Sequence, residues 1–291
     1  MKVLVLGSNG QLGWELTRTC PDHITLTSCD FPKVDFVSAA GISQCINSTK
    51  PDVIINAAAY TAVDKAEQEK ELAYRINHDA VHEIAEICSQ NTISLVHIST
   101  DFVFNGHSFK PYQPDDTPNP KSVYGKSKLK GEQAVRKILG DQALIIRTAW
   151  LYSSHGNNFV KTMLSLMSEK PSLNVIDEQI GTPTWGFGLA WAIWTALEKN
   201  IKGTFHWTDA GVASWYDFAM AVQEEGIKAG LLDKAIPVLP VTSDKFPTPA
   251  KRPMYSVLDK TSFWQALGTT PVHWRVQLRS MLKERRQISQ I

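Results

Sequence analysis

The glycines near the start of the chain most constrain how it can fold. The apolar run KVLVLG at 2–7 leads into GSNGQLG at 7–13, and a segment with helical spacing follows. Short apolar runs are typical of buried parallel strands. Glycines spaced as GxxGxxG permit a tight turn at Gly7, close approach of a pyrophosphate at Gly10 and close helix packing at Gly13. The pattern predicts a strand, a phosphate-binding loop and a helix, with an ordinary Gly-rich turn as the alternative.

Strands and helices alternate through the first half of the chain. Further strands are expected at HITLTSCD, PDVIINAAAY, ISLVHIST and ALIIRTAW, and helices at SAAGISQCINST, from about 64 to 90 and at 124–139. This alternation predicts an α/β fold, a Rossmann-type doubly wound parallel sheet. The second half holds eight of the nine tryptophans and Pro-bearing loops, and predicts a smaller α+β substrate domain. We expect an NAD(P)-binding domain at 1–148 and a second domain at 149–291, with some later segments returning to the first.

Charge and cysteine usage exclude several classes of protein. The formal net charge is +1, so no global field attracts nucleic acid or an anionic membrane. The four cysteines form no CxxC pair and no cluster with histidine, which argues against a disulfide or metal framework. No signal peptide and no apolar run long enough for a bilayer is evident. A cytoplasmic protein is expected.

Two features after the first helix fit a dinucleotide. Asp30 ends the second strand, roughly 20 residues past the last motif glycine, where a carboxylate binds the ribose 2′-hydroxyl. A carboxylate there favours NADH, but Lys33 could meet a 2′-phosphate, so NADPH stays open, as does a simple turn carboxylate. The small residues 57–59 leave room for a cofactor beside the third strand, although tight packing also favours alanine.

Tyr124 and Lys128 stand four residues apart and would share one helix face. A nearby ammonium lowers the pKa of a phenol, and Lys128 could also reach ribose hydroxyls. Tyr124 would then act as general acid toward a carbonyl oxygen that receives hydride. Ser99 and Thr100, at the end of the fourth strand, could supply a hydroxyl donor to the same oxygen. A solvated helix face is the alternative, but the order of the three parts favours catalysis.

This constellation resembles the extended short-chain dehydrogenase/reductase superfamily. The segments GSNGQLGWEL, PDVIINAAAYTAVDKAE, STDFVFNG, YGKSKLKGE, RTAWLY, GNNFVKTML, GTPT and FPTPAKRP resemble the dTDP-4-dehydrorhamnose reductase family over nearly the whole chain. The resemblance implies NAD(P)H-dependent reduction of the C4 ketone of dTDP-4-dehydro-6-deoxy-L-mannose to dTDP-L-rhamnose. Two alternatives stay open: another nucleotide-sugar epimerase or dehydratase of the superfamily, and a non-catalytic subunit similar to the regulatory β subunit of methionine adenosyltransferase.

The resemblance also assigns residues. Thr100, Tyr124 and Lys128 match the catalytic triad. Arg252 is a partner for the diphosphate or base, with a surface salt bridge as the alternative. The residues that match the cofactor site are Gly7, Asn9, Gly10, Gln11, Leu12, Gly13, Asp30, Ala57, Ala58, Ala59, Thr61, Ser99, Tyr124 and Lys128. Those that match the substrate site are Thr100, Phe102, Trp150, Asn158, Phe159, Lys161 and Arg252.

Some members of the family are dimers with Mg²⁺ held by glutamates at the interface. Glu15 and Glu284 match two of these glutamates, but the stretch after GTPT reads WGF, with no carboxylate near Phe187. A hard cation needs several oxygen ligands, so no required metal is expected, with Mg²⁺ kept as the alternative. The protein is expected as a monomer or homodimer. The residues available for an apolar contact between copies are Trp185, Phe187, Trp191 and Trp194, of which at least half are expected in the core.

Overall fold

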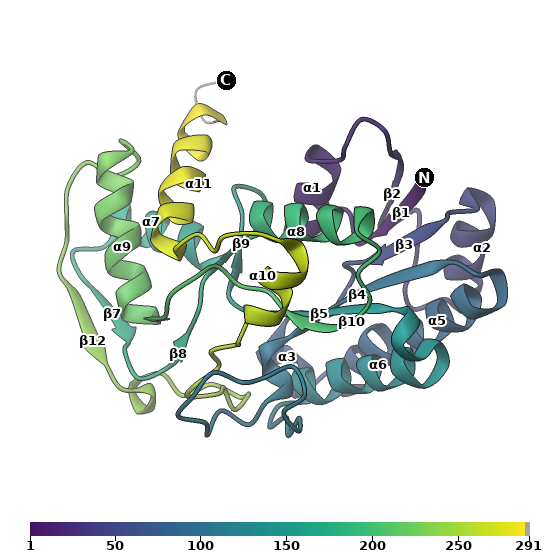
Figure 1. Ribbon diagram of the computed structural model, residues 1–291. Coiled ribbons are helices and arrows are strands. Elements are labelled where there is room, and N and C mark those ends of the chain that lie inside the picture. Colours follow the sequence, from purple (N-terminus) through teal and green to yellow (C-terminus); the bar gives the residue numbers. More distant parts are fainter. Residues whose placement is uncertain (289–291) are drawn as a thin grey trace.

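Within residues 1–288, which this computed structural model describes, six parallel strands form the central sheet. Their order across the sheet is β10-β5-β4-β3-β1-β2, and helices lie on both sides of it (Figure 1). The five strands expected in the first half are all present, and the Rossmann-type fold class is confirmed. The strands are β1 (Lys2–Leu6), β2 (Thr25–Cys29), β3 (Val53–Asn56), β4 (Ser94–Thr100), β5 (Leu144–Thr148) and β10 (Gly203–His206).

Alternate residues of each buried strand face opposite layers of helices. In β1, Val3 and Val5 belong to one apolar cluster, whereas Leu4 and Leu6 belong to another. Successive side chains of a strand point to opposite faces, so a strand covered on both sides is apolar throughout. The first cluster includes residues of α1 (Gln11–Arg18), α8 (Gly186–Glu198) and α10 (Thr261–Leu267). The second includes residues of α2 (Ala39–Thr49), α5 (Ala80–Asn91) and α6 (Val123–Leu139).

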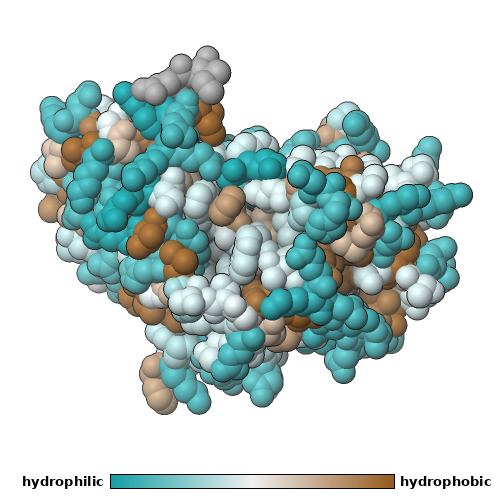
Figure 2. Space-filling view, turned by 45° about the horizontal axis from the view of Figure 1, so that its top comes forward, coloured by the Kyte–Doolittle hydropathy of each residue, from teal (hydrophilic) through white to brown (hydrophobic). Residues whose placement is uncertain are grey.

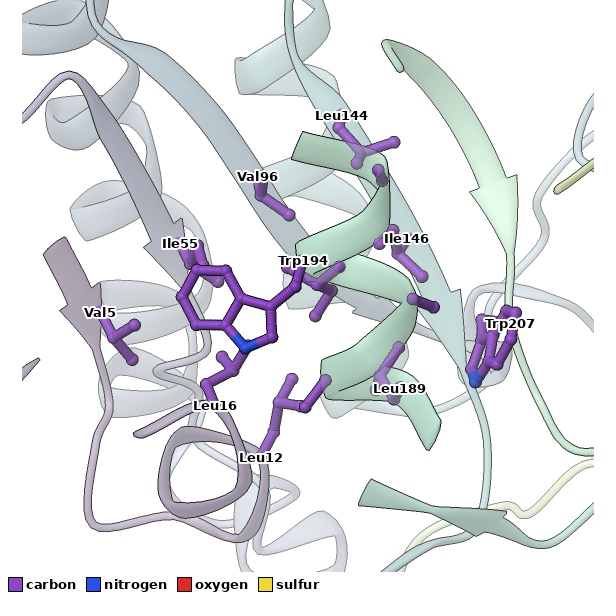
Figure 3. Packing of buried hydrophobic residues seen from close by; sticks show 14 of the residues in the cluster. Val5, Leu12, Leu16, Ile55, Val96, Leu144, Ile146, Leu189, Trp194 and Trp207 are labelled. Carbon is purple, nitrogen blue, oxygen red and sulfur yellow. The ribbon is translucent and has the colours of Figure 1, made fainter. Parts of the chain in front are cut away.

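Two elements from the second half complete the sheet and one of its helical layers. β10 pairs in parallel with β5. Trp194 of α8 points into the cluster that contains Val5, Ile55 and Val96 (Figure 3). The segments α8, β10 and α10 thus pack with the sheet of the first half, while the division into domains at 1–148 and 149–291 stays a prediction.

The rest of the second half packs around its own apolar cluster. Helices α7, α9 and α11 contribute Leu164, Phe218 and Leu282 to it. Short strands pair beside these helices as β6–β9, β7–β12 and β8–β11. The helices are α7 (Phe159–Glu169), α9 (Trp215–Lys228) and α11 (Trp274–Ile288). The strands are β6 (Leu151–Tyr152), β7 (Leu173–Ile176), β8 (Ile180–Gly181), β9 (Thr184–Trp185), β11 (Ala213–Ser214) and β12 (Val238–Val241).

The aromatic residues at and near α8 divide between core and surface. Trp185 and Trp194 are buried, whereas Phe187 is 36% and Trp191 41% exposed. Figure 2 shows a face on which hydrophobic residues are scattered between hydrophilic ones.

None of the helices in residues 1–288 combines the length and the apolar character needed to cross a bilayer.

The helical stretch expected from about 64 to 90 is present, but it is interrupted at 67–69 and contains a π-helical turn. The structure has α3 (Val63–Ala66), α4 (Lys70–Tyr74), a π-helical turn at Arg75–Asp79, and then α5. The break at 67–69 serves contacts with other segments. Glu67 Oε1 accepts a hydrogen bond from the backbone N of Val123, and Glu69 accepts one from the Tyr60 hydroxyl. Such contacts override local helical propensity.

Candidate active site

A cleft of about 580 Å³ opens at the carboxyl ends of β1, β3, β4 and β5. Ligands of open parallel sheets bind at this edge, beside the point where the strand order reverses. The cleft is lined by Gly7, Asn9, Gly10, Gln11, Leu12, Asp30, Phe36, Ala57, Ala58, Ala59, Thr61, Val63, Ile76, Ile98, Ser99, Thr100, Asp101, Phe102, Tyr124, Lys128, Thr148, Ala149, Trp150, Leu151, Gly156 and Asn157.

The loop between β1 and α1 has the shape of a pyrophosphate cradle. Gly7 has φ +85°, and a Cβ added there would lie 2.5 Å from the backbone N of Ala58. A Cβ on Gly13 would lie 2.2 Å from the Gly7 carbonyl oxygen, so the helix packs against the loop as expected. Gly10 caps α1 without a side-chain hydrogen bond. The first helical N–H groups therefore lack a side-chain partner, and the helix dipole favours an anion there.

Asp30 is fixed at the rim of this cradle. Its Oδ2 accepts a hydrogen bond from the backbone N of Asn9 at 2.8 Å, and its Oδ1 accepts one from the backbone N of Phe31 at 2.7 Å. Residues 57–59 lie beside it with methyl side chains only, which leaves the space a dinucleotide needs. The loop, the carboxylate and the alanines together fit a nicotinamide dinucleotide.

The helix α6 brings Tyr124 and Lys128 into the cleft. Its start is capped by Ser122, whose Oγ accepts from the backbone N of Gly125 at 3.1 Å. Lys128 is 2% exposed, and its Nζ donates to the carbonyl oxygen of Ile98 at 2.6 Å. Burial lowers the pKa of Lys128 to about 8, although the Glu132 carboxylate raises it in part. A cation held this rigidly has further N–H donors for ribose hydroxyls in the cleft.

The expected lowering of the Tyr124 pKa by Lys128 is wrong for the protein alone. Loss of water around the hydroxyl raises the pKa of Tyr124 to about 12, and the Asp101 charge adds to the rise, while a hydrogen bond with Thr100 lowers it. Desolvation disfavours the charged phenolate. Lys128 directs its ammonium toward Ile98 instead. Tyr124 is therefore a neutral phenol near pH 7, the form that can donate a proton.

Thr100 and Asp101 form a pair at the end of β4. The Thr100 hydroxyl donates to Asp101 Oδ1 at 3.0 Å and accepts from the backbone N of Phe102 at 3.2 Å. Asp101 is 2% exposed. Burial raises the pKa of Asp101 to about 6, against hydrogen bonds from Ser256 and Thr100 that lower it. The hydroxyl expected at this strand end is thus already engaged by a carboxyl group.

Trp150 forms one wall of the cleft in a strained conformation. Its φ of 46° is unusual for a bulky residue and places the ring against Trp215, with ring centroids 3.5 Å apart and planes 6° apart. Gly181 lies behind it, because a Cβ there would come within 2.6 Å of the ring. Such strain is typical of ligand-binding positions.

Five of the expected site residues do not line the cleft: Gly13, Asn158, Phe159, Lys161 and Arg252. Asn158 donates to Gln11 Oε1 at 3.0 Å, so it lies against the cradle. Phe159 packs on Trp215, with centroids 4.6 Å apart. Lys161 Nζ donates to the Gly156 carbonyl oxygen at 2.5 Å. Arg252 pairs with Asp64 at 2.6 Å, which is the salt bridge weighed as its alternative.

Sequence reasoning missed other residues of the cleft. Asp101 could have been found, because it directly follows Thr100 in the STD stretch. Thr148, at the end of β5, has a buried hydroxyl without a hydrogen-bond partner in residues 1–288, but a lone threonine gives no signal in a sequence. The others come from strands, loops and helices that only the fold brings together: Phe36, Val63, Ile76, Ile98, Ala149, Leu151, Gly156 and Asn157.

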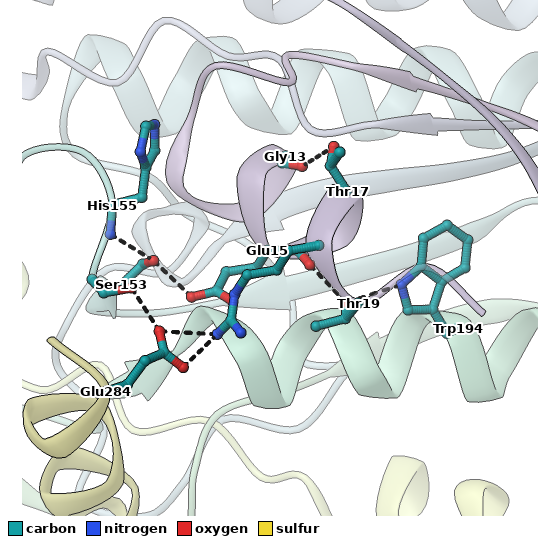
Figure 4. Close-up of polar contacts among 10 residues, drawn as sticks. Gly13, Glu15, Thr17, Thr19, Ser153, His155, Trp194 and Glu284 are labelled. Atoms are coloured by element: carbon teal, nitrogen blue, oxygen red, sulfur yellow. Dashed lines mark hydrogen bonds and ion pairs between the residues drawn. The ribbon is translucent and has the colours of Figure 1, made fainter. Parts of the chain in front are cut away.

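Glu15 and Glu284, which match magnesium ligands of the family, both form ion pairs with one arginine side chain (Figure 4). Arg18 Nε contacts Glu15 Oε2 at 2.6 Å, and its Nη2 contacts Glu284 Oε2 at 2.9 Å. The carboxylates also accept hydrogen bonds from Ser153 and Ser154, both at 2.7 Å. In residues 1–288 no group of three or more His, Cys, Asp or Glu is placed to hold a metal. A guanidinium that already balances both carboxylates does not fit a cation site.

The fold and the cleft define an α/β protein of the Rossmann type, with a glycine loop that fits a dinucleotide and a Thr–Tyr–Lys set lining the same cleft. The model described as RmlD substrate binding domain matches residues 1–287. The chain is 39% identical to the dTDP-4-dehydrorhamnose reductase of Escherichia coli K12, with 98% of each chain covered.

Solved structures agree. A crystal structure of a dTDP-4-dehydrorhamnose reductase from Clostridium acetobutylicum is 38% identical, covers 100% of both chains and has a TM-score of 0.90. That of the enzyme from Bacillus anthracis, in complex with NADP, is 33% identical, covers 97% of this chain and 99% of its own, and has a TM-score of 0.91. The chain belongs to the RmlD family, the family of the dTDP-4-dehydrorhamnose reductases.

Proposed function

We propose that the protein uses NAD(P)H to reduce the C4 ketone of dTDP-4-dehydro-6-deoxy-L-mannose (dTDP-4-dehydro-β-L-rhamnose) to dTDP-L-rhamnose, the last step of dTDP-rhamnose biosynthesis. The observation that carries the proposal is the convergence of Thr100, Tyr124 and Lys128 on the cleft that also contains the glycine cradle. The names of relatives with full-length coverage support the same reaction.

A reduced nicotinamide dinucleotide, when bound, supplies the hydride that the carbonyl carbon receives. The cradle at 7–13 would bind its pyrophosphate, and Asp30 a ribose hydroxyl, because backbone N–H groups and a fixed carboxylate face those positions. Lys128 would bind the nicotinamide ribose with the N–H groups that Ile98 does not use. The remaining proposed contacts come from Asn9, Gln11, Leu12, Ala57, Ala58, Ala59, Thr61 and Ser99.

Tyr124 would donate the proton to the ketone oxygen. Its pKa, raised to about 12, keeps the phenol protonated until charge develops on that oxygen. The phenolate left behind sits near the buried Lys128 and regains a proton from water. Hydride and proton together convert the ketone to an alcohol, so the sugar is reduced and the dinucleotide oxidised.

The sugar nucleotide would occupy the side of the cleft next to Phe102 and Trp150. Trp150 offers a flat apolar face that Trp215 supports from behind. Phe159 packs on Trp215 and would act by supporting this wall. Asn158 and Lys161 would act by holding Gln11 of the cradle and the Gly156 carbonyl beside it. Arg252 would reach the diphosphate only if it exchanged its ion pair with Asp64 for phosphate oxygens, and both of these side chains are partly exposed.

Asp30 favours NADH over NADPH in this proposal. Both carboxylate oxygens are held by backbone N–H groups, so the charge cannot turn away from a 2′-phosphate. The expected cytoplasmic location, the monomeric or homodimeric state and the absence of a required metal stay predictions.

The proposal is tested by mixing the purified protein with the keto-sugar and NADH or NADPH and following nicotinamide absorbance. Oxidation of the reductant, with dTDP-L-rhamnose as the product, is expected. An epimerase or dehydratase of the same fold would instead carry bound NAD⁺ and consume no external reductant. No oxidation above background with either reductant would overturn the proposal.

A further inference from the structure

Asp101 is a buried carboxyl group in the cleft for which the proposed reaction has no role. It directly follows Thr100, the last residue of β4, at the start of a 3₁₀ turn (Asp101–Val103), and is 2% exposed. Its Oδ1 accepts the Thr100 hydroxyl hydrogen at 3.0 Å, and its Oδ2 has no hydrogen-bond partner within residues 1–288. Burial costs the ionised form free energy. Asp101 is therefore costly to bury in its ionised form, and it lies beside the hydroxyls of Thr100 and Tyr124, so we looked for a role in the reaction.

The hydrogens at Thr100 can be counted. A hydroxyl has one hydrogen to donate and two lone pairs to accept with. An ionised Asp101 can only accept, so it holds the single Thr100 hydrogen. One lone pair of Thr100 accepts from the backbone N of Phe102, and Thr100 also contacts the Tyr124 hydroxyl. In this state Thr100 can orient Tyr124 but has no hydrogen left for a ketone oxygen.

Protonation of Asp101 reverses the direction of this chain. A neutral carboxyl can donate to Thr100, which frees the Thr100 hydrogen for the ketone oxygen. The titratable group that interacts with the Asp101 charge is Tyr124 of α6, and Ser256 lies close by from the segment before α10. Lys128 of α6 lines the same cleft, with its ammonium on the Ile98 carbonyl oxygen. Both forms of Asp101 are accessible near neutral pH, since burial raises its pKa to about 6.

We propose that Asp101 is a positioning residue that sets the hydrogen-bond direction of Thr100. It thereby decides whether the ketone oxygen receives one hydroxyl donor, from Tyr124, or two, from Tyr124 and Thr100. This inference rests on the proposed ketone reduction and deepens it. A preorganised donor at a developing oxyanion is worth about 10²–10³ in turnover, so turnover should fall by up to about 10²-fold as Asp101 ionises.

The test is the pH dependence of kcat from pH 5 to 8 for the wild type and three variants. The wild type is expected to lose turnover as pH rises through the pKa of Asp101. Asp101→Asn is expected to show no such fall, because an amide of the same shape does not ionise. Ser256→Ala is expected to move the midpoint upward, because the nearby Ser256 hydroxyl lowers the pKa of Asp101.

Asp209→Asn is the matched control. Asp209 is also buried, at 3% exposed, but it accepts from the backbone N of Trp185 away from the cleft. This variant should keep the wild-type profile, and Asp101→Asn should bind reduced cofactor with the wild-type dissociation constant.

Two outcomes would overturn the positioning role: an Asp101→Asn enzyme that keeps the pH-dependent fall, or a Ser256→Ala midpoint equal to the wild type. If Asp101→Asn does not fold, the midpoint of the Ser256→Ala pH profile tests the positioning role by itself. A wild type that reduces no keto-sugar at any pH overturns the proposed function itself. An active wild type with an unchanged Asp101→Asn profile overturns only the role of Asp101.

Discussion

Replacing Arg147 by methionine should leave a buried carboxylate unpaired on α6, the helix that carries Tyr124 and Lys128. Glu132 is completely buried and Arg147 1% exposed, and two hydrogen bonds of 2.9 and 2.8 Å join them. Removing one partner of such a pair costs about 3–5 kcal/mol, since the other charge stays buried. Arg136 also contacts Glu132 at 3.0 Å and remains, so we expect about 3 kcal/mol. A loss of that size lowers Tm by about 6–12 °C in a chain of this length.

Urea unfolding and thermal scans measure the effect against Arg136→Met, whose side chain is 39% exposed and should cost at most about 1 kcal/mol. The double variant Glu132→Gln with Arg147→Met should recover part of the loss, because no charge is then stranded. An Arg147→Met variant no less stable than Arg136→Met would refute the reasoning.

The pH dependence gives a second check on the same pair. Burial alone would raise the pKa of Glu132, but the hydrogen bond and charge of Arg147 hold it below its usual value. Because the pKa of Glu132 is lower in the folded than in the unfolded chain, its ionisation stabilises the fold at pH values above the unfolded pKa. This stabilisation is lost as the pH falls toward the folded-state pKa. In the Arg147→Met variant the main group that lowers the pKa of Glu132 is gone, whereas burial still raises it, so this pKa should rise. In the variant Glu132 should therefore become neutral as the pH falls from 7 to 5, and the difference in free energy of unfolding between wild type and variant should shrink. A difference that stays constant would show that an unpaired buried charge is not the cause.

Four further predictions concern the cleft. Tyr124→Phe should lose about 10²–10⁴ in kcat while the cofactor dissociation constant, measured by nicotinamide fluorescence, stays unchanged; full turnover would remove Tyr124 as the acid. Asp30→Ser should raise kcat/KM for NADPH relative to NADH by about tenfold, because removal of a like charge a few ångströms away is worth about 1–4 kcal/mol; equal ratios in both enzymes would contradict this. Gly181→Ala should raise KM for the sugar nucleotide and spare cofactor binding, because the new Cβ would displace the Trp150 ring; an unchanged KM would remove the ring from the substrate wall. EDTA should leave turnover unchanged, since the Arg18 guanidinium already balances its two carboxylates; a loss that Mg²⁺ restores would show a required metal.

Local sequence patterns were enough to predict most of the fold and part of the candidate site. The strand before Gly7, the turn and the helix after it are set by neighbouring residues, so the sequence predicts this strand–turn–helix unit correctly. The four-residue spacing of Tyr124 and Lys128 fixes their common helix face in the same way. Asp30 and the alanines at 57–59 follow their strands directly, and parallel strands end at one edge.

Interactions between segments far apart in the chain were decided only by the tertiary structure. The helical stretch expected at 64–90 is interrupted at 67–69, where Glu67 accepts a hydrogen bond from the backbone N of Val123, a contact with no local signal. The pKa of Tyr124 rises because several elements together exclude water from its hydroxyl, and no spacing within one helix reports that sum.

The same holds for the charges around the cleft. The sequence shows Glu15 and Glu284 as two carboxylates without saying what balances them, whereas the folded chain puts Arg18 between them. Asp101 stands beside Thr100 in the sequence, but its burial, which raises its pKa, and the approach of Ser256, which lowers it, are visible only in the folded chain. Sequence by itself thus determined the backbone scaffold and the catalytic residue types, because these follow from short-range periodicity. Tertiary structure decided their protonation and hydrogen-bond directions, because burial and charge act through space.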